Sequence, residues 1–123
     1  MKEALLESDP EIINLVSLKA RFLGNTELLE RVLSTFAETL DADLRSLEQA
    51  IHADNSEDAA FVAHRIKGMA ASIEARTLWK NASIAEECAK HKLMDKLSRS
   101  LTQLQSDRET LSEVLRLEGC AAS

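Results

Sequence analysis

The chain has 123 residues, of which 45% are hydrophobic and only 3% aromatic, with a single proline and three glycines. Residues that favour strands are scarce, so the composition predicts an all-helical fold, and the length fits one domain over residues 1–123. The formal net charge of −6 argues against a nucleic-acid partner, which would require a basic surface.

No apolar run is long enough to span a bilayer, and the N-terminus lacks the apolar core of a signal peptide. The two cysteines, Cys88 and Cys120, are far apart and have neither the spacing of a metal site nor that of a disulfide framework. We therefore expect a cytoplasmic protein that does not associate with membranes.

The first two predicted helices begin at recognisable start signals. Asp9-Pro10-Glu11 combines a capping residue, a proline at the first helical position and an acid, which predicts a short helix from there to about Leu23. Thr26 is the expected cap of the second helix, which extends to Ile51 because apolar residues recur every three or four positions. Its apolar positions are Leu29, Val32 or Leu33, Phe36, Leu40, Leu44, Leu47 and Ile51.

Three further helices follow from the same periodicity. One begins after a cap at Ser56, the next extends from about Arg76 to Lys90, and the last extends from about Leu93 to Leu117. Their predicted inward positions are Val62, Ile66, Met69, Ile73, Leu78, Ala82, Ala85, Ala89, Leu97, Leu101, Leu104, Leu111 and Leu115. The pattern predicts an up-down-up-down four-helix bundle with a short additional N-terminal helix. The ordered core is expected at about 9–118, with a frayed tail at 119–123.

A histidine in the third predicted helix is the strongest functional signal. His64 shares a helix face with Lys67, Gly68 and Ala71, because residues three and four apart are neighbours on a helix surface. Glycine in mid-helix costs about 1 kcal/mol relative to alanine, which is compensated where another molecule approaches closely. Lys67 places an ammonium group where an anion on the ring would lie. The face is suited to an anionic group and a docking partner, with Phe61 as an apolar contact beside it.

The residues alone leave two other interpretations open. His64 can be an ordinary surface histidine of a purely structural helical adaptor. Residues 64–80 have four basic residues against one acid, an excess that can be ordinary surface charge. A metal site is the weakest alternative, because His52, His64 and His91 are widely separated.

The run from His64 to Ile73 resembles the signature of histidine-containing phosphotransfer (HPt) domains of bacterial multistep phosphorelays. That signature is a histidine, a variable residue, an apolar residue, Lys-Gly and then small residues. The chain departs from it at Met69, where the family often has serine, and at Glu74, where it commonly has glycine. Downstream, four further positions agree with the family pattern: Ala75, Leu78, Ala82 and Glu86.

The resemblance implies a phosphorelay intermediary. His64 would accept a phosphoryl group from a receiver-domain aspartate and pass it to another receiver, and Lys67 would stabilise the phosphoryl charge. Glu86 would orient the imidazole ring. The remaining partner-binding residues would be Phe61, Arg65, Gly68 and Ala71.

The implied partners are receiver domains of response regulators, a hybrid sensor histidine kinase, or both. The resemblance implies no cofactor on this chain, since the receiver supplies Mg²⁺, and no ATP site or autokinase activity. A sensor-kinase phosphoacceptor domain fits less well, because those domains resemble one another in an acidic residue directly after the histidine, where this chain has Arg65. We expect a monomer.

Overall fold

The computed structural model describes residues 9–119, in which it has five helices and no strand. The helices are α2 (Leu15–Arg21), α3 (Thr26–His52), α4 (Ser56–Ser72), α5 (Arg76–Lys90) and α6 (Met94–Leu117). The prediction of an all-helical fold is therefore confirmed. Most of the predicted frayed tail lies outside the described residues.

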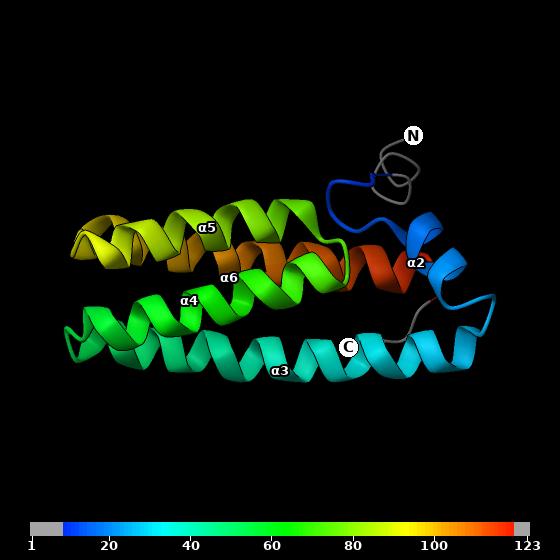
Figure 1. Ribbon diagram of the computed structural model, residues 1–123, viewed down its shortest axis with the longest axis horizontal. Helices are drawn as coiled ribbons and strands as arrows, with labels where there is room; N and C mark the ends of the chain where they lie inside the picture. Colours follow the sequence, from blue (N-terminus) through cyan, green and yellow to red (C-terminus); the bar gives the residue numbers. More distant parts are fainter. Residues whose placement is uncertain (1–8, 120–123) are drawn as a thin grey trace.

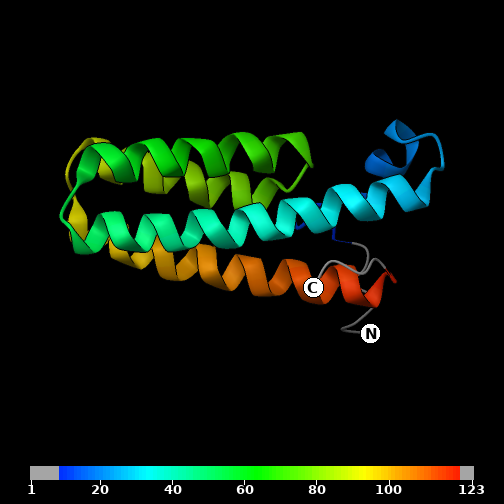
Figure 2. The ribbon, with the colours of Figure 1, turned by 90° about the horizontal axis from the view of Figure 1, so that it is seen from below.

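The four long helices lie side by side, and the short α2 lies at one end of them (Figure 1). α4 packs against α3 and α5, and α6 packs against the same two helices, which closes a four-helix arrangement around one core. The α3–α4 and α5–α6 connections lie at one end of the molecule, and the α4–α5 connection lies toward the other (Figures 1 and 2).

The core is built from the apolar positions that the periodicity predicts. Leucines dominate it, and burial of each large apolar side chain contributes roughly 1.5–3 kcal/mol. Of the positions predicted to face inward on the last three helices, all are buried except Met69, which is half-buried. The fully buried large side chains are Leu18, Leu29, Leu33, Leu40, Leu47, Ile66, Leu97, Leu104, Leu115 and Val114.

The predicted start of the first helix is wrong. Residues 10–12 form a turn, and the helix begins only at Leu15 after an N-cap at Asn14. The Asn14 side-chain oxygen accepts a hydrogen bond from the backbone N–H of Ser17. Asp9 is an equally good capping residue, but its side-chain oxygen accepts a hydrogen bond from the backbone N–H of Glu11, only two residues on, which belongs to a turn and not to a helix start.

The predicted caps of the next two helices are each displaced by one residue. Asn25, not Thr26, caps α3, and Asn55, not Ser56, caps α4. The two asparagine side chains accept hydrogen bonds from the backbone N–H groups of Leu28 and Asp58. Asparagine ranks above threonine as a cap, which agrees with Asn25. Asparagine and serine are about equally good, so the sequence alone does not choose between Asn55 and Ser56.

Glu74, the departure from the family's glycine, does not prevent α4 from ending in the usual way. Its φ of 57° lies in the left-handed region. The N–H of Glu74 donates to the carbonyl of Ala71, and the N–H of Ala75 donates to that of Ala70. This pair of bonds is the Schellman motif, which normally uses glycine at this position.

Among the described residues, no helix combines the length and the apolar character that crossing a membrane requires.

Candidate functional site

His64 lies on the exposed side of α4, and 66% of its side chain is accessible to solvent. On the opposite side of α4, Ala63 and Ile66 are fully buried and pack this part of the helix into the core. A Cβ atom added to Gly68 would meet no heavy atom within 4 Å, so open space lies above this glycine. No contact inside the described protein therefore accounts for glycine here, and the low surface is available to another molecule.

The imidazole of His64 is held by a carboxylate from the neighbouring helix. Glu86 lies on α5, and only 6% of its side chain is exposed. Its Oε2 is 2.9 Å from Nδ1 of His64, and its Oε1 is 2.7 Å from Nζ of Lys67. A third donor, Nζ of Lys90, lies 3.3 Å from Oε2. We refer to His64, Lys67, Glu86 and Lys90 as the His64 cluster.

The His64 cluster keeps Glu86 ionised. Burial opposes ionisation of this carboxyl, but hydrogen bonds from Lys67, Lys90 and His64 outweigh the burial and hold its pKa below the ordinary value of 4.5. A carboxylate can only accept hydrogen bonds, so Nδ1 of His64 must carry the proton. In the neutral ring the lone pair is then on Nε2, which has no hydrogen-bond partner in residues 9–119.

Arg65 points away from the His64 cluster toward α3. Its Nη2 and Nε atoms lie 2.6 and 3.0 Å from Oδ1 of Asp43, a side chain that is almost completely buried. The guanidinium also lies 5.3 Å from the centroid of the exposed Phe61 ring. Lys67, and not Arg65, is therefore the cation beside the imidazole.

The structure brings together three of the predicted residues, His64, Lys67 and Glu86. Gly68 and Ala71, both exposed, follow them along α4, whereas Phe61 and Arg65 lie on the side of α4 nearer to α3. In residues 9–119 no group of three or more His, Cys, Asp or Glu side chains is arranged to hold a metal ion.

Sequence reasoning missed Lys90 and Asp43. Lys90 follows Glu86 by four residues on the same helix, a spacing that predicts an ion pair. Asp43 is a single polar residue among the apolar positions of α3. Its contact with Arg65 depends on how α3 and α4 are aligned. No local signal in the sequence reveals that alignment.

The residues of the His64 cluster fall within a region that a family model recognises. No curated protein and no solved structure matches the chain. The model of the Hpt domain matches residues 31–118, which include most of α3, all of α4, α5 and α6, and every residue of the His64 cluster. With a match over most of its length, the chain belongs to the Hpt domain family.

Proposed function

We propose that this chain carries a phosphoryl group on Nε2 of His64, accepted from an aspartate of one receiver domain and passed to an aspartate of another. The Hpt family acts by histidine phosphotransfer in phosphorelays, through contact with receiver domains. The observation that supports the proposal most strongly is the exposed imidazole whose Nδ1 is bound to the buried carboxylate of Glu86.

The transfer step uses the tautomer that Glu86 selects. The Nε2 lone pair of neutral His64 attacks the phosphorus of the aspartyl phosphate, the P–N bond forms, and the P–O bond to the aspartate breaks. The aspartate leaves as a carboxylate and the ring becomes cationic, with its proton still on Nδ1. The Glu86 carboxylate, 2.9 Å away, stabilises that developing charge. Reversal of the same step delivers the phosphoryl group to the next receiver.

Lys67 and Lys90 have different parts in this proposal. A phosphoryl group on Nε2 brings roughly two negative charges next to Lys67, which is bound to Glu86 before transfer. Lys67 can then turn to the phosphoryl oxygens, while Lys90 remains on Glu86 and keeps the buried carboxylate compensated. Because two cations bind Glu86, Lys67 can leave and the buried carboxylate still has Lys90 as an ion-pair partner.

The remaining expectations follow from the family. The Mg²⁺ and the acidic residues that activate the aspartyl phosphate would belong to the receiver, and this chain would act as a carrier without an ATP site. We further propose a cytoplasmic monomer whose bundle has up-down-up-down order, with the α4–α5 face open to the partner.

The test is transfer of labelled phosphoryl groups from a panel of phosphorylated receiver domains. Wild type is compared with His64→Gln, and His52→Gln and His91→Gln serve as matched controls because both of those histidines are also exposed. Label lost only in His64→Gln, and labile to acid but stable to alkali, supports the proposal. Equal label on wild type and His64→Gln, or no label from any receiver, contradicts it.

A further inference from the structure

A hollow of about 710 Å³ lies beside the α4–α5 turn, outside the His64 cluster. The buried residues Ala70 and Ala75 and the partly exposed Trp79 give it an apolar lining. Two exposed cations, Arg76 and Lys80, also line it. We refer to it as the Trp79 hollow.

The Trp79 hollow continues the face that carries His64. Ala71 lines the hollow and lies seven residues after His64 on α4, which is about 10 Å along the helix axis. Between them, on the same face, Gly68 leaves open space. A low surface therefore leads from the imidazole to the hollow.

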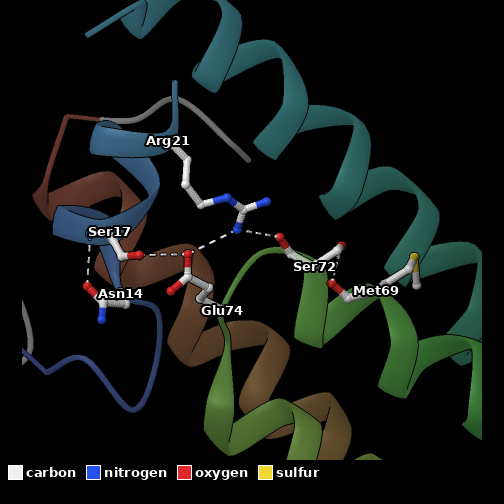
Figure 3. Close-up of polar contacts among 6 residues, drawn as sticks. All are labelled: Asn14, Ser17, Arg21, Met69, Ser72 and Glu74. Carbon is white, nitrogen blue, oxygen red and sulfur yellow. Dashed lines mark hydrogen bonds and ion pairs between the residues drawn. The ribbon is translucent and has the colours of Figure 1, made fainter. Parts of the chain in front are cut away.

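One wall of the hollow is formed by the segment that precedes α2, and Glu74 holds this segment in place. The Glu74 carboxylate accepts hydrogen bonds from Oγ of Ser17 at 2.9 Å and from Nη1 of Arg21 at 3.0 Å (Figure 3). The same nitrogen of Arg21 donates to the carbonyl of Ser72, at the end of α4. The backbone N–H of Asn14 donates to the carbonyl of Glu74. The Glu74 carbonyl therefore binds the wall at Asn14, and the Glu74 carboxylate holds α2, which follows that wall.

The chemistry of the hollow favours an apolar side chain with a carboxylate nearby. Trp79 is 42% exposed, a large apolar surface of the kind that proteins use to bind partners. The hollow's carboxylates already face cations, Glu74 with Arg21 and Glu11 with Arg76. Lys80 is exposed and forms no ion pair within residues 9–119.

We propose that the Trp79 hollow is part of the receiver-docking surface, and that the receiver which exchanges phosphate with His64 places an apolar side chain against Trp79 and a carboxylate near Lys80. This inference rests on the proposed function. A standard interface covers about 800 Å² on each partner, a disc of about 16 Å radius. A receiver centred on His64 therefore reaches a hollow that begins about 10 Å away.

The test measures binding and transfer separately, with the receiver domain that labels His64 fastest. Affinity for the unphosphorylated receiver is measured by calorimetry for wild type, Trp79→Ala, Lys80→Glu and Ile84→Ala. Ile84 is the matched control because it is 54% exposed on α5 but lines a different hollow. Lys80→Glu changes only an exposed side chain, so it tests the surface even if Trp79→Ala folds poorly.

We expect Trp79→Ala and Lys80→Glu each to weaken receiver binding at least fivefold. Each should raise the receiver concentration that half-saturates phosphotransfer by the same factor. The transfer rate at saturation should stay within twofold, and Ile84→Ala should bind like wild type. His64→Gln should bind normally without accepting label. If transfer to wild type occurs but both hollow variants bind within twofold of wild type, this inference fails and the proposed function stands. If no receiver transfers label to wild type, both fail.

Discussion

Nδ1 of His64 lies 2.9 Å from Oε2 of Glu86, so a largely exposed ring on α4 is held by an almost completely buried carboxylate on α5. The contact joins two helices across 22 residues of sequence. It fixes which nitrogen holds the proton, and that choice determines which nitrogen can attack phosphorus.

The stability that Glu86 provides should depend on pH. Burial opposes its ionisation, yet the bonds from Lys67, Lys90 and His64 hold its folded-state pKa below 4.5. A carboxyl whose pKa is lower in the folded state than in the unfolded state stabilises the fold at pH values above the unfolded-state pKa. This stabilisation is lost as the pH falls through the folded-state pKa. The free energy of unfolding in urea should therefore be larger for wild type than for Glu86→Gln at pH 7, and this difference should shrink as pH falls below 4.5. A constant difference over this range would contradict the account.

Lys67→Gln should reduce how much phosphorylated protein accumulates, by about tenfold, because a charge-assisted contact to the phosphoryl group is lost. Lys67→Arg should recover most of the yield. The measurement is the equilibrium fraction of label on this chain against a fixed pool of phosphorylated receiver. Lys96→Gln on α6 is the control, and an unchanged yield in Lys67→Gln would contradict a role for this ammonium.

Gly68→Ala should stabilise the protein by about 1 kcal/mol and yet slow phosphotransfer. A methyl group at this position meets nothing within 4 Å inside the protein, so helix propensity alone sets the change in stability. The same methyl group would stand where a receiver has to approach His64. Thermal unfolding tests the gain in stability, and the transfer rate at low receiver concentration tests the slower phosphotransfer. Ser106→Ala on α6 is the control. A stabilised variant with a normal rate would show that the receiver does not approach here.

Glu74→Gly should leave overall stability within about 1 kcal/mol of wild type. Removing a side chain from the left-handed region relieves strain, while loss of the contacts to Ser17 and Arg21 costs a similar amount. Amide hydrogens of α2 should lose protection from exchange, and those of the four long helices should not. Asp54→Gly, a second non-glycine residue with positive φ, should relieve strain without affecting α2. Unchanged protection of α2 in Glu74→Gly would rule out this role for the carboxylate.

The helices could be predicted from sequence because their determinants are local. Leucine and alanine recur with helical spacing, and α5 extends over the predicted residues, Arg76–Lys90. The helix starts were less certain where two capping residues of equal strength are adjacent, as at Asn55-Ser56. The prediction of where the first helix starts was wrong because Asp9-Pro10 belongs to a turn and Asn14 caps the helix instead.

Part of the candidate site was equally accessible from sequence, because His64, Lys67 and Gly68 follow one another on one helix. The burial of Glu86 and its simultaneous contact with three donors were not accessible. They depend on the alignment of α5 against α4, which is set by packing of the whole core. The same holds for Asp43, whose place among apolar residues gives no hint of its contact with Arg65.

NMR spectroscopy of the chain labelled with ¹⁵N in its histidines, after phosphorylation by its receiver, distinguishes Nε2 of His64 from every other histidine nitrogen. Coupling between ³¹P and ¹⁵N identifies which ring nitrogen of which histidine carries phosphorus. We predict a single phosphohistidine, His64, modified at Nε2 with the proton retained on Nδ1. Phosphorus on Nδ1 of His64, or on His52 or His91, would contradict it.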